Sequence, residues 1–235
     1  MSTSTEDFFN ELGDQYDQVI RRCVPQYAEM LESMMDYLPP KLLTRIARDQ
    51  ASVPALKILE LGSGSGNLSS IILDRFPESK LTVVDSSEKL IAVVKSRFGK
   101  RIHHYQKTLF QDLDFKDNSF DLIISSISIH HLNDDEKLQL FKNSRQWLTP
   151  NSPLAFCDQF RGETDAIYQK HLKNWKTSSF ELGSNEAEWE AWMEHQEAHD
   201  FHSTIRTHFD LLEKAGFQSI DCTRRYLLWT TMIAM

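Results

Sequence analysis

A glycine-rich segment, Glu60 to Asn67 (ELGSGSGN), constrains this 235-residue chain more than any other part of it. It follows the apolar run Lys57 to Leu61, which has the length and composition of a buried strand, and it leads into an amphipathic helix expected over 67–76. Glycines at 62, 64 and 66 permit a tight turn and bring the N–H groups of a helix N-terminus close to a ligand. A strand, a glycine-rich turn and a helix in this order predict the first unit of a nucleotide-binding sheet.

Apolar runs of strand length alternate with helical patterns in the segment that follows. Strands are expected over 81–84, 103–107, 120–125 and 153–157, and helices over 87–98 and 134–147. Such alternation is typical of βαβ units, which give a parallel sheet with helices wound on both faces.

The alternation is interrupted once. Residues 163–200 carry three of the five tryptophans and many charges at helical spacing, so we expect inserted helices after the fifth strand, over about 161–200. A helix over 203–215 then ends at Gly216, and strands over 218–223 and 226–234 form a hairpin that turns at Arg224-Arg225. The prediction is an α/β, doubly wound, seven-stranded and mostly parallel sheet, Rossmann-like, whose last strand is antiparallel.

The N-terminal segment has a different pattern. Apolar residues recur at helical spacing between residues 8 and 50, and Pro39-Pro40 interrupts them. We therefore expect a helical lid over 1–50 and a ligand-binding domain over 51–235.

The composition of the chain disfavours nucleic acid and membranes as partners. The chain has 26 Lys and Arg against 34 Asp and Glu, and this net charge of −8 disfavours a nucleic-acid substrate, because phosphate binding needs a clustered basic surface. No apolar run approaches the roughly 20 residues that span a bilayer, and the N-terminus predicts no signal peptide. Three cysteines without CxxC spacing indicate reduced thiols. We expect a cytoplasmic protein that acts on a small molecule, without nucleic acid or membrane, as a monomer or a homodimer.

A second acid stands where a nucleotide-binding sheet would need one. Asp85 ends the second expected strand, about 20 residues beyond the glycines, where a carboxylate can accept hydrogen bonds from both ribose hydroxyls. Asp85 could also cap the following helix, because Asp85 with Glu88 has the spacing of a capping box.

These residues resemble the class I methyltransferases that use S-adenosylmethionine (SAM). ELGSGSGN is similar to their first motif, Asp85 to their ribose-binding acid, and Gln111-Asp112-Leu113 to the loop whose acid meets the adenine amino group. The resemblance covers 55–160 and the terminal hairpin. It implies SAM as the cofactor and a cofactor site made of Glu60, Gly62, Ser63, Gly64, Gly66, Asp85, Ser86, Asp112, Leu113 and Ser126.

The segment after the fourth strand, Ser125 to Leu132 (SSISIHHL), belongs at the carboxyl edge of the sheet, beside the reactive methyl group. It is similar to the IHHL turn of small-molecule methyltransferases, and the Pro-Pro motif of DNA adenine methyltransferases is absent. His130 and His131 are therefore the candidate catalytic residues. One of the two imidazoles could instead be structural, packed beneath the helix cap at Asn133-Asp-Asp-Glu136.

The N-terminal helix resembles the lid of two related branches, the carboxy-SAM synthases and a set of bacterial small-molecule methyltransferases. The matching residues are Tyr16-Asp17 and the stretch Arg21 to Tyr27. The resemblance implies that Tyr16 and Arg21 or Arg22 close over the methionine end of SAM, where an arginine can pair with its carboxylate. A solvated basic turn is the alternative.

The acceptor side is less defined by sequence. Arg161, His199 and Tyr226 are candidate substrate-binding residues, and with the two lid arginines they favour a small anionic acceptor. His195 and His199 lie four residues apart, but no HExxH or CxxC pattern accompanies them, so we expect no metal and interpret the C-terminal histidines as solvated or substrate-facing.

The predicted function is SAM-dependent methyl transfer to an O, N or C nucleophile of a small molecule. Because the sulfonium is already activated, alignment of nucleophile, methyl and sulfur supplies most of the acceleration. Three alternatives remain: an enzyme like carboxy-SAM synthase, a non-catalytic SAM-binding protein, and a nucleotide-dependent oxidoreductase. The GxGxG spacing and the IHHL turn disfavour the last.

Overall fold

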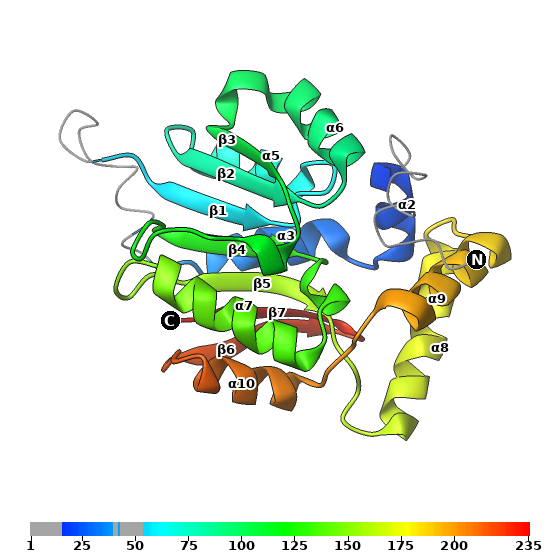
Figure 1. Cartoon of the computed structure of the whole chain (residues 1–235). Coiled ribbons are helices and arrows are strands. Elements are labelled where there is room, and N and C mark those ends of the chain that lie inside the picture. The colour runs from blue at the N-terminus through cyan, green and yellow to red at the C-terminus, as the bar shows by residue number, and fades with distance from the viewer. Residues whose placement is uncertain (1–15, 40–41, 43–53) are drawn as a thin grey trace.

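The computed structural model describes residues 16–39, 42 and 54–235. A seven-stranded sheet with the order β3-β2-β1-β4-β5-β7-β6 forms its centre (Figure 1). The strands are β1 (Lys57–Leu61), β2 (Lys80–Asp85), β3 (His104–Lys107), β4 (Leu122–Ser126), β5 (Leu154–Gln159), β6 (Ile220–Tyr226) and β7 (Trp229–Ala234). β1 to β5 pair in parallel and β7 is antiparallel to both of its neighbours. The predicted sheet, including its antiparallel last strand, is confirmed.

Helices cover both faces of the sheet and bury a separate apolar core on each. On one face lie α3 (Tyr27–Asp36), α5 (Asn67–Arg75) and α6 (Glu88–Phe98), and on the other α7 (Asp134–Trp147) and α10 (Ile205–Lys214). The central strands present apolar side chains to both faces, so β1, β4 and β5 read as continuous apolar runs rather than as alternating ones.

The terminal hairpin differs from the prediction in the place of its turn. Arg224 and Arg225 lie within β6, where they pair with Thr231 and Thr230, and the chain reverses at 227–228. A register irregularity between Cys222 and Arg224 lets the strand run on past the residues expected to turn. The expected turn at Arg224-Arg225 is therefore wrong.

Three helices lie beyond the carboxyl ends of the strands (Figure 1). α8 (Asp165–Glu181) and α9 (Glu186–His199) follow β5, as the tryptophans and charges predicted, and α2 (Tyr16–Cys23) precedes α3. Trp175 of α8 is fully buried, and its Nε1–H donates to the carbonyl oxygen of Cys23 over 2.5 Å. Its ring also makes edge contacts with Trp189 and Trp229. Trp175 therefore joins α8 to α2 and to β7.

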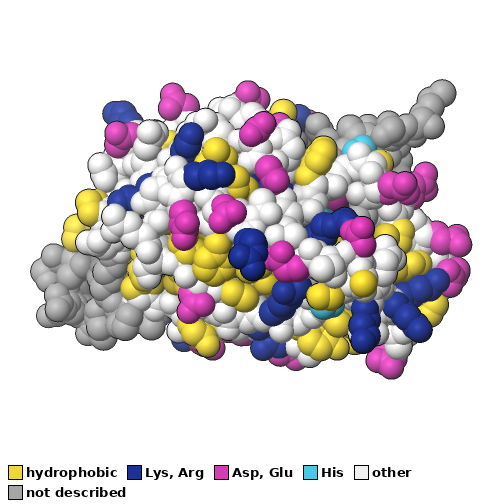
Figure 2. All heavy atoms as spheres, turned by 90° about the horizontal axis from the view of Figure 1, so that it is seen from below, with side chains coloured by type: hydrophobic (Ala, Val, Ile, Leu, Met, Phe, Trp, Pro, Cys, Tyr) yellow, Lys and Arg dark blue, Asp and Glu magenta, His cyan; other side chains and the backbone are white. Residues whose placement is uncertain are grey.

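One face of the molecule carries charges of both signs. Figure 2 shows the face around α10 and β6, where acidic and basic side chains are interspersed and apolar groups lie between them. Among the described residues, no helix is both long enough and apolar enough to cross a membrane. The proposed boundary between lid and domain at 50–51 falls outside the described residues, so this division stays a prediction.

Candidate functional site

The glycine-rich turn between β1 and α5 has backbone angles and close contacts that a residue with a Cβ atom would not fit. Gly62 has φ +70°, and a Cβ built on it would lie 2.4 Å from Cβ of Ser128. A Cβ on Gly66, whose φ is +88°, would lie 2.6 Å from the ring of Phe98. The Oγ atoms of Ser125 and Ser128 also lie within hydrogen-bond distance of the carbonyl oxygen of Leu61, at 2.8 and 3.2 Å. The turn is thus pressed against the end of β4, and glycine is required by close approach as well as by conformation.

Asp85, at the carboxyl end of β2, holds the same turn from the other side. Its Oδ2 accepts from the N–H of Gly64 over 2.8 Å and its Oδ1 from the N–H of Ser87 over 2.9 Å. The alternative role of Asp85 as a helix cap is wrong, because α6 is capped by Ser87, whose Oγ accepts from the N–H of Leu90. Each carboxylate oxygen has a second lone pair, so Asp85 can still accept from a ribose hydroxyl.

Glu60 is a fully buried carboxyl group beneath the turn. Ser69 Oγ donates to its Oε2 over 2.5 Å, while its Oε1 and the Oγ of buried Ser63 have no hydrogen-bond partner among the described residues. Burial raises the pKa of Glu60 to about 8. Orphaned buried acceptors are rare, and this one fits the ammonium group of a SAM molecule laid along the turn.

The remaining predicted cofactor residues lie around this turn at different depths. Ser86 and Ser126 are partly buried at the ends of β2 and β4, while Asp112 is exposed in the short helix η3 (Phe110–Asp112) and Leu113 is buried. Their contacts with SAM stay predictions. Phe110 was missed by sequence reasoning, although its ring would lie 3.5 Å from a Cβ on Gly62 and so borders the cofactor turn.

Helix α2 contacts the turn through Asp17, a residue of the matching lid stretch to which the sequence assigned no role of its own. Asp17 accepts hydrogen bonds from Ser65 Oγ and, over 2.9 Å, from Asn67 Nδ2. Arg22 pairs with Glu188 of α9 over 2.6 Å, and Arg21 is exposed, 6.0 Å from the centre of the Tyr27 ring. The side chain of Tyr16 lies outside the described residues. A lid function for these residues stays a prediction.

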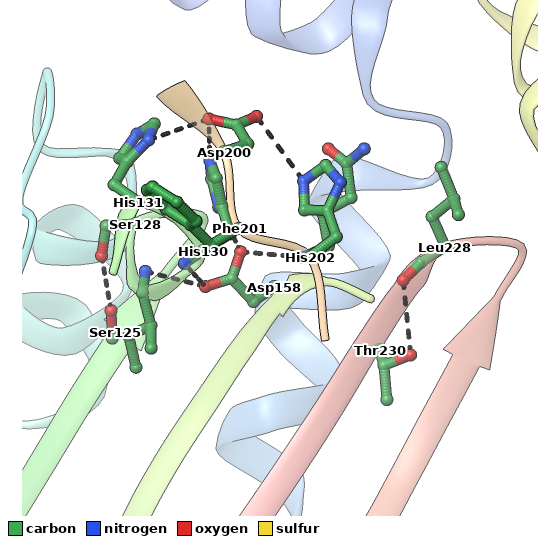
Figure 3. Close-up of polar contacts among 12 residues, drawn as sticks. Ser125, Ser128, His130, His131, Asp158, Asp200, Phe201, His202, Leu228 and Thr230 are labelled. Carbon is green, nitrogen blue, oxygen red and sulfur yellow. Dashed lines mark hydrogen bonds and ion pairs between the residues drawn. The ribbon is translucent and has the colours of Figure 1, made fainter. Parts of the chain in front are cut away.

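The two candidate catalytic histidines lie in η4 (Ile129–His131), directly after β4 (Figure 3). His130 is buried, and its Nδ1 lies 2.5 Å from Oδ1 of Asp158 at the end of β5. The other oxygen of Asp158 accepts from the N–H groups of Ile129 and His130 over 2.8 and 3.1 Å. Asp158 therefore fixes both the turn and the orientation of the His130 ring.

Four imidazoles approach Asp200, in the segment after α9, and Figure 3 shows those of His130, His131 and His202. Its Oδ1 lies 3.0 Å from Nδ1 of His131, 3.6 Å from Nε2 of His130 and 3.8 Å from Nε2 of His195. Its Oδ2 lies 3.5 Å from Nε2 of His202. We call His130, His131, His195, His202, Asp158 and Asp200 the histidine cluster.

A buried lysine holds the loop that carries Asp200. Lys137 of α7 is fully buried, and its Nζ donates to the carbonyl oxygen of Phe201 and, over 2.9 Å, to Ser203 Oγ. The N–H of Phe201 in turn donates to the carbonyl oxygen of His130 over 2.7 Å. Sequence reasoning gave no role to Lys137, whose place in an otherwise regular amphipathic helix was the one available signal.

The electrostatics of the histidine cluster divide its imidazoles into two kinds. Burial disfavours the charged form of His130, but the carboxylates of Asp158 and Asp200 outweigh it and raise its pKa. Burial lowers the pKa of His131, and the positive charge of His130 lowers it further. Burial also lowers the pKa of His195, to about 4. Although burial alone would raise the pKa of Asp200, the histidines around it hold that pKa well below its ordinary value. His131 and His195 are thus neutral at pH 7.

The predicted substrate-binding residues are distributed more widely. Arg161 pairs with Asp165 and lies 4.6 Å from the centre of the Tyr168 ring. His199 is partly exposed with its ring 5.0 Å from that of His195, and Tyr226 ends β6. Contact of these three residues with a substrate stays a prediction. The interpretation of the C-terminal histidines as solvated is wrong for His195 and His208, which are both buried.

A polar chain that sequence reasoning missed extends the histidine cluster toward α8 and α9. Gln159 Nε2 donates to Oε1 of Gln196 over 2.6 Å, and Gln196 Nε2 donates to the hydroxyl of Tyr168 over 3.1 Å. The Tyr168 hydroxyl lies 3.2 Å from Nδ1 of His202. The chain therefore links β5, both inserted helices and the segment after α9.

Comparisons with known proteins agree with this geometry. The methyltransferase domain family matches residues 58–151, from β1 to just before β5. Over 130 residues the chain is 30% identical to a malonyl-[acyl-carrier protein] O-methyltransferase of Bacillus cytotoxicus, a match that covers 54% of this chain and 40% of that relative's length. An uncharacterized methyltransferase of Bacillus cereus is 24% identical over 97% of both chains.

A solved structure shares the fold over nearly the whole chain. The methyltransferase in a Haloferax volcanii complex with the Trm112 activator superposes with a TM-score of 0.68, covering 98% of this chain and 96% of that one at 13% identity. Family match, relatives and fold therefore agree with the glycine-rich turn and the acid that ends β2. Together they support a class I SAM-dependent methyltransferase.

Proposed function

We propose that the chain transfers the methyl group of SAM to an O, N or C nucleophile of a small molecule bound beside the histidine cluster. One observation carries the proposal. Ser128 packs against Gly62 of the cofactor turn, and His130 and His131 follow two and three residues later. The turn that suits SAM and the polar groups that suit an acceptor therefore share one edge of the sheet.

The residues of the cofactor side suit each part of SAM. Asp85 would accept from the ribose hydroxyls, and the orphaned Oε1 of Glu60 would accept from the ammonium group, directly or through water. Bound SAM supplies an activated methyl group, and the protein supplies alignment and exclusion of water. Arg21 or Arg22 would pair with the SAM carboxylate, which for Arg22 requires exchange of its present partner, Glu188.

His131 is the acceptor-side residue that we propose to handle a proton. It is neutral and its side chain is 17% exposed, whereas the side chain of His130 is only 6% exposed. With Nδ1 directed at Asp200, the second ring nitrogen is the basic one. His130 would position the pair through Asp158 and Asp200.

The arginines expected to recognise an anionic acceptor already have carboxylate partners within the chain. Arg161, which was expected to recognise an anion, already pairs with Asp165, and Arg22 pairs with Glu188. An anionic acceptor would have to displace one of these carboxylates. The carrier-linked malonyl group named for the Bacillus cytotoxicus relative is one anionic candidate, to be included in a screen.

A screen with methyl-labelled SAM and a panel of small metabolites tests the proposal. We expect one acceptor to be labelled, with release of S-adenosylhomocysteine, and His131→Ala to lower turnover by about 10²-fold while SAM affinity is kept. His103→Ala, at an exposed histidine outside the histidine cluster, is the control. Tight SAM binding without labelling of any acceptor would favour a non-catalytic SAM-binding protein. With a carboxylate donor included in the panel, conversion of SAM itself into its carboxymethyl sulfonium would favour the carboxy-SAM synthase branch.

A further inference from the structure

The histidine cluster contains more nitrogen donors than a proton transfer requires. Three imidazole nitrogens approach one oxygen, Oδ1 of Asp200, at 3.0, 3.6 and 3.8 Å. They come from His131, His130 and His195, on two separate elements. A cation placed between these closely spaced donor atoms would have them as its ligands.

We propose that His130, His131 and Asp200 bind a divalent transition-metal ion. One donor atom from each of these three residues lies within 4.8 Å of the others, and His195 lies nearby but outside this set. Around an ion with bonds of about 2.0–2.1 Å, neighbouring ligand atoms stand about 3.0–3.4 Å apart. The two shortest separations, 3.0 and 3.6 Å, need only small side-chain movements to meet that range.

The contact between His130 and Asp158 supports a ligand role for the other ring nitrogen. Metal-ligating histidines commonly donate their second N–H to a carboxylate, which fixes the tautomer and the ring orientation. Nδ1 of His130 lies 2.5 Å from Asp158, and Nε2 is the nitrogen that faces Asp200. Asp158 is itself held by two backbone N–H groups, so the ring is fixed before any ion arrives.

Charge and donor type indicate the class of ion. Asp158 and Asp200 are two carboxylates whose side chains are only 2% and 3% exposed, and a divalent ion compensates such buried charge. Imidazole-rich donor sets suit Zn²⁺, Fe²⁺, Co²⁺ or Ni²⁺, whereas Mg²⁺ and Ca²⁺ prefer oxygen ligands. His131 is the most exposed member of the three, so the ion would reach the site, and an acceptor would reach the ion, from its side.

This site departs from the expectation of no metal. The expected motifs place their ligands close together in sequence, but here adjacent histidines combine with an aspartate from the segment after α9. The inference goes beyond methyl transfer, since the ion would bind whether or not SAM is present. With an ion bound, His131 would serve as its ligand, and the ion would take over activation of the acceptor.

Titration of the full-length, metal-free chain with Co²⁺ tests the site, because the visible absorption of Co²⁺ reports its ligands and its coordination number. We expect one Co²⁺ per chain, displaceable by Zn²⁺, and a rise in melting temperature on binding. His131→Gln and Asp200→Asn should weaken Co²⁺ binding by more than 10-fold, and Asp158→Asn by about 10- to 100-fold. His103→Gln, at an exposed histidine, should bind Co²⁺ like the wild type.

Two results would overturn the site: no saturable Co²⁺ binding by the wild type, or unchanged affinity and spectrum in His131→Gln. Asp200 is buried, so His131→Gln, at the more exposed position, decides the matter if Asp200→Asn does not fold. Calorimetry of SAM with the metal-free chain separates this inference from the proposed function. Asp85→Ala should lose SAM affinity and keep Co²⁺ binding, and His131→Gln should do the reverse.

Discussion

The cofactor side and the acceptor side of the sheet edge are built from different materials. On the cofactor side, backbone groups and two acids make the site, and the partners are close in sequence: Gly64 and Asp85 are 21 residues apart, and Glu60 and Ser69 are 9 apart. On the acceptor side, side chains make the site, and Lys137 and Ser203 are 66 residues apart. Apart from the contacts that Ser128 and Asp17 make with the turn, the first side is therefore fixed by local structure, whereas the second depends on how α8 and α9 are anchored.

The largest expected effect concerns Trp175, which anchors the inserted helix α8 to α2 and β7. Trp175→Ala should lower the free energy of unfolding by about 3–5 kcal/mol, because a fully buried indole and its hydrogen bond to Cys23 are lost. Urea denaturation measures this loss. SAM affinity, measured by calorimetry where the variant is folded, should stay within about twofold of the wild type if the cofactor side is independent.

Phe180→Ala, a partly exposed aromatic residue on the same helix, is the matched control and should cost much less. A parallel loss of SAM affinity in Trp175→Ala would show that the two sides are coupled and that the comparison fails.

The buried acid of the cofactor side gives the next largest effect. The pKa of Glu60 is about 8 in the folded chain and near its ordinary value of 4.5 when unfolded. The folded state therefore holds a proton that the unfolded state has lost, and stability falls as pH rises from about 5 to 8. Relative to Glu60→Gln, we expect the wild type to lose up to about 4 kcal/mol across this range.

Urea denaturation of both proteins at several pH values measures this difference, with Glu88→Gln, at an exposed glutamate, as the control. Parallel stability curves for Glu60→Gln and the wild type would mean that Glu60 is ionised in the folded chain.

A variant of Asp85 tests the cofactor side through its affinity for SAM. Asp85→Ala should weaken SAM binding by about 1.5–3 kcal/mol, through loss of charge-assisted hydrogen bonds to the ribose and of support for Gly64. Calorimetry should show this loss with the acceptor KM little changed. Asp114→Ala, at an exposed acid beyond η3, should bind SAM normally. Undiminished SAM affinity in a folded Asp85→Ala variant would remove the ribose assignment.

The smallest expected effect concerns the ion pair between α2 and α9. Arg22 and Glu188 are 31% and 25% exposed, so a double-mutant cycle with alanine at both positions should give a coupling energy of about 0.2–1 kcal/mol in stability. If Arg22 exchanges Glu188 for the SAM carboxylate, Arg22→Ala should also weaken SAM binding, while Glu188→Ala should strengthen it. Equal SAM affinity in both variants would leave the pair as a structural tie alone.

The same difference in construction explains how far sequence reasoning reached. The strands, the glycine-rich turn and Asp85 could be predicted because their signals lie within one βαβ unit. Asp158 and Asp200 could not be assigned as partners of His130, because nothing local tells which acid of a long insertion returns to the sheet edge. The hairpin turn was misplaced since two arginines resemble a polar turn, whereas the irregularity near Cys222 keeps them in β6.

The contact between Trp175 and Cys23 spans 152 residues and has a consequence for synthesis of the chain. At about 5–20 residues per second, a ribosome needs roughly 8–30 s to produce the partner of α2 after α2 itself has emerged. During that interval the apolar side chains Val19 and Ile20 of α2 lack α8, which contacts α2 in the finished protein. The strands that carry the glycine-rich turn emerge earlier, so the elements proposed to hold SAM are synthesised before the helices proposed to border an acceptor.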